Sequence, residues 1–174
     1  VMLALITGGS GSGKSAWAEG LAQRLCPGPK LYLATMRPGG GEAQARILRH
    51  RALRRGKGFR TVECPDGFAG LSLPRGETAL LEDLSNLAAN RRFSPAPPDD
   101  CAGVLLRELE ELAGRCAHLI VVSNEIFSDG VAYDPDATDY LSLLSHLNRE
   151  LARRADLAVE VVCGLPLVLK GALL

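Results

Sequence analysis

Eight residues near the start of the chain carry the pattern of a phosphate-binding loop. The stretch GGSGSGKS places Gly8, Gly13, Lys14 and Ser15 in the order GxxxxGK[ST]. The glycines of such a loop let backbone amides point toward phosphate oxygens, the lysine reaches the outer phosphates, and the serine hydroxyl is a ligand for magnesium. A glycine-rich turn that binds nothing is the alternative. Because a strand-like run precedes the loop and a helical pattern follows it, we predict a nucleotide site made by Gly8, Gly9, Ser10, Gly11, Ser12, Gly13, Lys14 and Ser15.

Acidic residues that could hold a magnesium ion follow two of the apolar runs. In TALLEDLSN, Glu82 comes directly after the run and is the first candidate ligand, with Asp83 as the runner-up, since a slip of one residue at the strand end would exchange them. The competing interpretation is a carboxylate that stabilises a helix N-terminus. Asn124 and Glu125 follow the next run, at the sheet edge where open α/β folds bind ligands.

A third group of candidates lies in a basic segment, EAQARILRHRALRRGKGFRTVE, which spans residues 42–63. It surrounds His50 with cationic side chains, namely Arg46, Arg49, Arg51, Arg54, Arg55, Lys57 and Arg60. A solvated helix face explains the charge most simply. A nucleic-acid surface is disfavoured, because Phe59 is the lone aromatic side chain nearby for base stacking. In a phosphate-loop protein the arginines could instead hold phosphates, and neighbouring cations would favour the neutral, nucleophilic form of His50.

Alternating strand-like and helix-like segments must position these residues. Short apolar runs at 2–6, 31–34, 79–81, 119–122 and 158–162 have the length of strands buried on both faces. Helical spacing of apolar residues marks 15–25, 105–112 and 141–151, and residues 91–100 read as an exposed loop. The closing stretch CGLPLVLKG predicts a turn at 164–166 and a short edge strand. This order predicts an α/β fold with a mainly parallel sheet, helices on both faces, and a phosphate-loop, RecA-like architecture.

Composition sets the broader limits. With 174 residues, the chain is expected to form one domain, residues 1–174. Twenty basic and twenty acidic residues cancel, which argues against general binding to nucleic acid or membranes. The five cysteines are scattered and favour reduced thiols over a disulfide framework, and the apolar runs are too short to cross a bilayer. We therefore expect a cytoplasmic protein.

Several of these stretches, taken in order, resemble one enzyme family nearly from end to end. They are ITGGSGSGKSAWAE, LYLAT, EAQARILRHR, FRTVE, ALLEDLSN, VVSNE, LNRELARRAD and VEVVCGLPLVLK. Together they resemble the bifunctional adenosylcobinamide kinase and adenosylcobinamide-phosphate guanylyltransferase of cobalamin assembly. The resemblance implies two reactions: ATP or GTP phosphorylates the aminopropanol hydroxyl of adenosylcobinamide, and GMP from GTP is then transferred through a guanylylated histidine to give adenosylcobinamide-GDP.

By motif position the resemblance makes His50 that histidine. Lys14 of the phosphate loop is the second residue that we expect to be catalytic, because it reaches the outer phosphates. It implies nucleotide contacts from Arg51, Arg54 and Glu63, a Mg²⁺ ion on Ser15 and Glu82, a corrinoid substrate, and a homotrimer. The chain departs from the family pattern at Arg49, where relatives often have a second histidine, and at IFSDGVAYDP, where Phe127 and Asp129 replace glycines. Two alternatives therefore stay open: a kinase for another hydroxylated metabolite without guanylyl transfer, and a nucleotide-binding module that has lost its chemistry.

Overall fold

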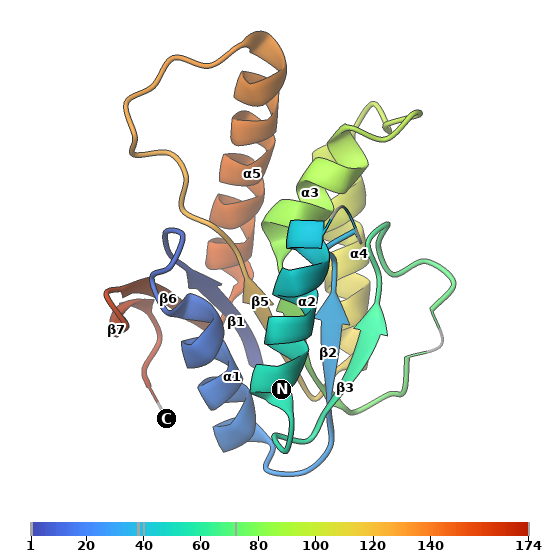
Figure 1. Cartoon of the computed structure of the whole chain (residues 1–174), viewed down its shortest axis with the longest axis vertical. Helices are drawn as coiled ribbons and strands as arrows, with labels where there is room; N and C mark the ends of the chain where they lie inside the picture. Colours follow the sequence, from blue (N-terminus) through green and yellow to red (C-terminus); the bar gives the residue numbers. More distant parts are fainter. Residues whose placement is uncertain (1, 38, 40, 72, 174) are drawn as a thin grey trace.

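One seven-stranded sheet organises the chain. The structure is a computed structural model that describes residues 2–37, 39, 41–71 and 73–173, but not the side chains of Glu42, Ala43, Arg46, His50 and Leu53. The strands are β1 (Met2–Thr7), β2 (Lys30–Ala34), β3 (Phe59–Glu63), β4 (Thr78–Glu82), β5 (His118–Val122), β6 (Leu157–Val162) and β7 (Leu165–Lys170). Their order is β3-β2-β4-β5-β1-β6-β7, and every pairing is parallel except the last, β6 with β7 (Figure 1). The predicted mainly parallel α/β sheet is confirmed.

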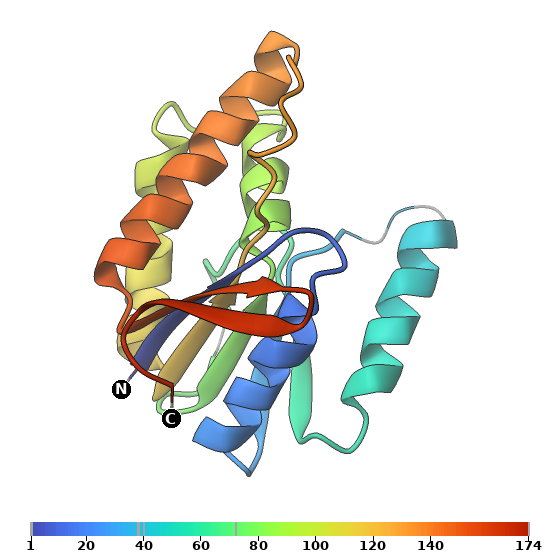
Figure 2. The same ribbon diagram turned by 90° about the vertical axis from the view of Figure 1, so that its left-hand side faces the viewer.

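In the part of the chain that the structure describes, five helices cover the two faces of the sheet. They are α1 (Lys14–Leu25), α2 (Gly41–Arg54), α3 (Leu84–Arg92), α4 (Cys101–Arg115) and α5 (Pro135–Arg154). Figure 2 shows α1 and α2 on one side of the sheet and α3, α4 and α5 on the other, with α2 standing at the margin. Each face has its own core, because alternate residues of the strands point to opposite sides: Ile6 and Leu80 pack with α1, whereas Leu5 and Leu81 pack with α3, α4 and α5.

Local chemistry explains where the helices begin. Asp83, Asp100 and Asp134 precede α3, α4 and α5, and each carboxylate accepts a hydrogen bond from a backbone N–H in the first turn, at 2.7, 2.8 and 2.9 Å. Such caps satisfy amide groups that have no partner within the helix. Proline at the first position of α5 starts that helix without losing a hydrogen bond.

Three segments differ from the sequence-based expectation. Residues 59–63, which we included in the basic segment, form the edge strand β3, and α3 extends to Arg92 so that the loop before α4 is shorter than predicted. The turn before the last strand is a two-residue turn at Cys163 and Gly164, with φ of 52° and 79°. Pro166 lies inside β7, where an edge position leaves its missing N–H without cost.

The cysteines and the apolar segments gave two further expectations, which concern disulfide bonds and membrane-spanning helices. All five cysteines are free thiols, as their scattered positions indicated. Among the helices of the described residues, none combines the length and the apolar character needed to cross a bilayer.

Candidate active site

The phosphate-loop motif forms a wrapped loop between β1 and α1. Gly13 adopts a left-handed conformation with φ of 90° just before the helix begins at Lys14. The Lys14 ammonium group folds back over the loop and donates to the Gly9 carbonyl oxygen at 3.1 Å, and the Ser12 N–H donates to the same oxygen at 3.2 Å. The loop thus holds the shape that surrounds phosphates, with its lysine inside.

The β6–β7 turn supports this loop from behind. The Gly164 N–H donates to the Ser12 carbonyl oxygen at 2.8 Å. A Cβ added to Gly13 would lie 3.2 Å from Gly164 Cα, and one added to Gly8 would lie 2.5 Å from the Val161 carbonyl oxygen. Glycine is required at these positions because backbone atoms of another segment occupy the space of a side chain.

This close approach predicts different effects for neighbouring glycines. Gly8→Ala forces a Cβ against the Val161 carbonyl, so we expect the melting temperature to fall by roughly 3–10 °C. Gly9→Ala is the matched control, because a Cβ there meets nothing within 4 Å, and it should stay within about 2 °C of the parent. Thermal unfolding without nucleotide measures both; equal melting temperatures would contradict the packing described.

A cavity of about 650 Å³ opens in front of the loop. Loop residues 10–16 form one wall and α2 forms another. The remaining lining comes from the carboxyl ends of the strands and the segments that follow them: Tyr32, Ala34, Met36, Glu63, Glu82, Asp83, Asn86, Asn124 and Ile126. The phosphate loop and helix α2 therefore line one cavity.

Glu82 lies against the magnesium-binding position of the motif. The Ser15 hydroxyl donates to Glu82 Oε1 at 2.5 Å, while Oε2 is buried and has no hydrogen-bond partner among the described residues. Burial raises the pKa of Glu82 to about 7, against the lowering effect of the Ser15 hydrogen bond. A carboxylate oxygen without a partner beside a serine hydroxyl is the donor set that a hard cation prefers.

Asp83, the runner-up, has a different task. Its Oδ1 accepts the Asn86 N–H at 2.7 Å and caps α3, as the competing interpretation of an acidic residue at a helix N-terminus suggested. Burial also raises the pKa of Asp83. Although Asp83 lines the cavity, its carboxylate already serves the helix, so the geometry favours Glu82 as the metal ligand.

The raised pKa of Glu82 predicts a pH-dependent stability. The pKa of Glu82 is about 7 in the folded state and near 4.5 in the unfolded state, so between these pH values the folded protein holds a proton that the unfolded chain has lost. The contribution of Glu82 to stability is therefore present below pH 4.5 and is lost as the pH rises to about 7. Glu82→Gln imitates the protonated form. Without nucleotide or Mg²⁺, the variant should match the parent near pH 5 and exceed it by about 1–3 kcal/mol at pH 8.

Denaturant unfolding at a series of pH values measures this difference. Glu111→Gln, which makes the same change on the exposed surface of α4, should show no such trend. If the difference in stability between Glu82→Gln and the parent is the same at pH 5 and at pH 8, the raised pKa of Glu82 is wrong.

Asn124 and Glu125, the other predicted polar pair, separate. Asn124 lines the cavity; its N–H donates to Ser85 Oγ at 2.9 Å and its carbonyl oxygen accepts from Asn148 at 3.4 Å. Glu125 turns into its own loop, where its carboxylate accepts from the Phe127 N–H and the Ser128 hydroxyl. The structure therefore places Asn124, but not Glu125, in the cavity wall.

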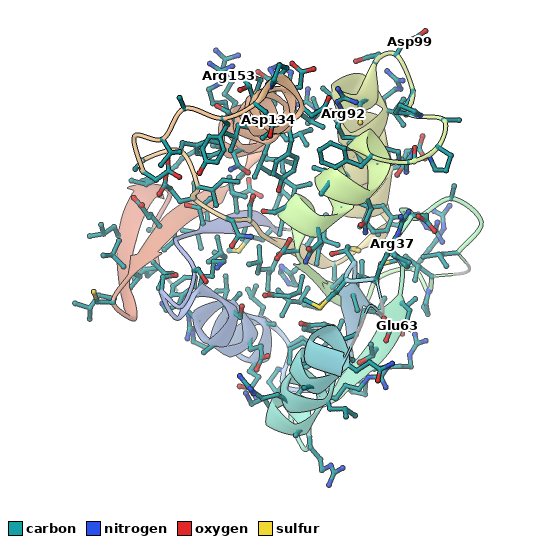
Figure 3. All side chains as sticks on the ribbon, turned by 45° about the horizontal axis from the view of Figure 1, so that its top comes forward. Arg37, Glu63, Arg92, Asp99, Asp134 and Arg153 are labelled. Atoms are coloured by element: carbon teal, nitrogen blue, oxygen red, sulfur yellow. The ribbon has the colours of Figure 1, made fainter. Side chains whose placement is uncertain are left out.

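Helix α2 presents its basic residues to the cavity. Arg49, Arg51 and Arg54 line the wall, and Arg51 pairs with Glu63 at 2.6 Å. Figure 3 shows Glu63 beside this helix. The side chain of His50 lies outside the described residues. Position 50 lies in α2 three residues after Ile47 and four before Arg54, and both of these residues line the cavity.

Two polar residues of the lining were not among our sequence-based candidates. Tyr32 lies in the middle of β2 with its ring beneath the Arg54 guanidinium, and Asn86 lies in the first turn of α3. A tyrosine inside an otherwise apolar buried strand was the available signal, since a buried phenol needs a polar neighbour. For Asn86 the sequence offers no distinct signal.

Comparison with known proteins decides the family. Residues 4–169 match the family described as cobinamide kinase / cobinamide phosphate guanyltransferase. The chain belongs to this family. It is 36% identical over 172 residues to the bifunctional adenosylcobalamin biosynthesis protein CobP of Pseudomonas aeruginosa, with 96% of each chain covered. It is 29% identical to the bifunctional adenosylcobalamin biosynthesis protein CobU of Salmonella typhimurium, with 97% of this chain and 100% of that protein covered.

A solved structure supports the fold assignment. An ATPase from the type III secretion system of pathogenic bacteria superposes with a TM-score of 0.54 at 17% identity, covering 91% of this chain and 50% of that one. At that identity the likeness concerns the fold, which is of the phosphate-loop type. The cobinamide kinase / guanyltransferase family membership accounts for the two activities: the chain is a transferase that acts as a kinase and as a nucleotidyltransferase in cobalamin biosynthesis.

Proposed function

We propose that this chain carries out both reactions in the one cavity, with His50 as the residue that accepts GMP. The observation that carries the proposal is the shared wall: the phosphate loop and the α2 residues Ile47, Arg51 and Arg54, which surround position 50 in the sequence, line the same space. A nucleotide bound by the loop therefore lies within reach of the helix. The family membership supplies the substrates, adenosylcobinamide and its phosphate, with ATP or GTP as nucleotide.

In the phosphorylation step, the loop amides and Lys14 hold the outer phosphates of the nucleotide. The aminopropanol hydroxyl of adenosylcobinamide attacks the γ-phosphorus, the bond to the β-phosphate oxygen breaks, and the nucleoside diphosphate leaves. Lys14 donates to the phosphate oxygens that gain charge, and its contact with the Gly9 carbonyl keeps it aimed across the loop.

The residues beside Lys14 fit a magnesium ion. Ser15 and Glu82 offer oxygen atoms at one point, and Glu82 Oε2 lacks a partner among the described residues. The described residues contain no cluster of three His, Cys, Asp or Glu side chains, so a cation here depends on these two residues, water and the phosphates, which is the usual way proteins bind Mg²⁺. When bound, the ion neutralises charge on the phosphate oxygens.

In the guanylyl step, the imidazole of His50 attacks the α-phosphorus of GTP. A nitrogen–phosphorus bond forms, the bond to the bridging oxygen breaks, and pyrophosphate leaves. A phosphate oxygen of adenosylcobinamide phosphate then attacks the same phosphorus and releases the histidine. The guanidinium groups of Arg51 and Arg54 stabilise negative charge on the phosphorus oxygens, and Glu63 orients Arg51 while contributing to the nucleotide site.

We also propose a cytoplasmic homotrimer. Five free thiols suit a reducing compartment, where both nucleotides are available. Exposed apolar residues along β7, including Leu165, Leu167 and Leu169, suit burial against another subunit. Sedimentation equilibrium measures the mass of the assembly in solution; a monomer at micromolar concentration would contradict the trimer.

Two radiolabels test the proposed reactions on the purified protein. With adenosylcobinamide, label on the γ-phosphate of ATP or GTP should move to the corrinoid. With label on the α-phosphate of GTP, an acid-labile, alkali-stable protein adduct should form and pass its label to adenosylcobinamide phosphate. Transfer of γ-label without an α-label adduct selects a kinase alone, in which the basic helix only holds phosphates. Nucleotide binding without either transfer selects a binding module.

A further inference from the structure

Arg54 is a buried cation with no carboxylate partner among the described residues. Its exposed fraction is 6%, and its Nε and Nη1 atoms are buried without a hydrogen-bond partner there. Two neighbouring cations, by contrast, have carboxylate partners: Arg51 pairs with Glu63, and Lys57 pairs with the buried Glu19 at 2.6 Å. An unpaired charge away from water is costly, so a residue kept in this state at a cavity wall indicates an anionic ligand.

An aromatic ring holds the guanidinium in place. The Arg54 guanidinium carbon lies 3.4 Å from the centroid of the Tyr32 ring, and Tyr32 is itself only 4% exposed. Stacking on the ring face partly compensates the charge and leaves the N–H groups at the edge of the plane free to donate. The stack therefore fixes the orientation of Arg54 before a ligand binds.

Further contacts fix the ring in turn. Phe59, on the neighbouring strand β3, meets Tyr32 edge to face with a centroid distance of 5.9 Å and an interplanar angle of 83°. Lys30 covers the face of Phe59 at 5.1 Å, and its ammonium group is held by the carbonyl oxygens of Gly28 and Lys57. Because edge-to-face geometry is preferred for aromatic pairs, this row limits rotation and tilt of the Tyr32 ring.

The position of Arg54 in the helix identifies the phosphate it would hold. Residues 50 and 54 are one helical turn apart on α2, and Arg54 lines the cavity. We propose that Tyr32 is a positioning residue for guanylyl transfer: its ring presents Arg54 to an oxygen of the phosphate that is transferred to His50. This inference rests on the proposed function, since it concerns the second reaction of the same cavity.

The ring and the hydroxyl of Tyr32 can be separated by substitution. Tyr32→Leu removes the stacking face, and we expect kcat/KM for formation of the GMP adduct to fall about tenfold or more. Tyr32→Phe keeps the aromatic ring under Arg54, and its kcat/KM for adduct formation should lie within about threefold of the parent value. At saturating nucleotide, the kcat of phosphoryl transfer from the γ-phosphate should fall less than that of adduct formation in Tyr32→Leu, because Lys14 and not Arg54 contacts the γ-phosphate.

A double-mutant cycle tests whether Tyr32 acts through Arg54. In an Arg54→Ala background, adding Tyr32→Leu should cost no more than about twofold in adduct formation, because the group it positions is already absent. Three results would each overturn the proposal. They are a double variant whose loss equals the product of the two single losses, equal losses in adduct formation and phosphoryl transfer, and a rate of adduct formation in Tyr32→Phe as low as in Tyr32→Leu.

Equilibrium binding separates this inference from the proposed function. If the parent forms no adduct, the guanylyl step is wrong, whereas GTP affinity measured by calorimetry still reports on Arg54. Tyr32→Leu should then weaken GTP binding at least about fivefold and Tyr32→Phe should not. Unchanged affinity in Tyr32→Leu would reject the positioning role regardless of the outcome for His50.

Discussion

Replacing Lys14 by alanine is expected to lower phosphoryl transfer to adenosylcobinamide by about 10²–10⁴-fold. Lys14 is the charged side chain that the phosphate loop itself supplies, and its ammonium group is already placed over the loop by the Gly9 carbonyl. It gains contact with phosphate oxygens as they acquire charge, so its loss removes stabilisation of the transition state more than binding of the ground state. The main effect should therefore appear in kcat.

Steady-state assays with γ-labelled nucleotide measure this change. Lys170→Ala makes the same substitution on β7, at an exposed position outside the cavity, and should leave the rate unchanged. A Lys14→Ala enzyme that keeps more than a tenth of the parent kcat would show that the loop does not carry out phosphoryl transfer.

His50→Ala should abolish guanylyl transfer while leaving phosphorylation of adenosylcobinamide within a few-fold of the parent. The nucleophiles of the two reactions attack different phosphorus atoms of the nucleotide. In the proposed mechanism, only guanylyl transfer uses an imidazole nucleophile. Loss of a covalent nucleophile leaves no route to the intermediate, so the residual guanylyl rate should be below about 10⁻³ of the parent.

His146→Ala is the matched control, because His146 is exposed on α5 and does not line the cavity. Parallel assays with α-labelled and γ-labelled GTP measure both reactions on each variant. Loss of both reactions in His50→Ala would indicate damage to the whole cavity, and an unchanged guanylyl rate would exclude His50 as the nucleophile.

Local patterns were sufficient for the phosphate loop and most of the sheet. Runs such as Leu119–Val122 are apolar throughout because parallel strands are buried on both faces, and this leaves a clear trace in the sequence. Strand β3 leaves a weaker trace: it lies at the sheet edge, and its exposed residues Arg60 and Glu63 leave no continuous apolar run. The short helix α3 starts directly at its cap, Asp83, without an intervening loop.

Some features of the site could not be predicted from the sequence, because a shift of one residue along a strand changes the side of the sheet to which a side chain points. Glu82 and Asp83 are neighbours, and strand alternation alone cannot tell which one turns toward α1. Packing against Ser15 settles the orientation of Glu82. The contact between Arg54 and Tyr32 joins α2 to β2 across 22 positions of sequence, so it depends on how the helix docks on the sheet and not on any local spacing.

Peptide mapping by mass spectrometry after incubation with GTP and Mg²⁺ shows whether His50 carries GMP. The protein is freed of excess nucleotide and digested at neutral or alkaline pH, where a phosphoramidate survives, and each peptide is examined for the added mass of GMP. We predict that the peptide from α2 carries GMP and that fragmentation places the GMP on His50. GMP on another residue, or no modified peptide from a protein that binds GTP, would contradict it.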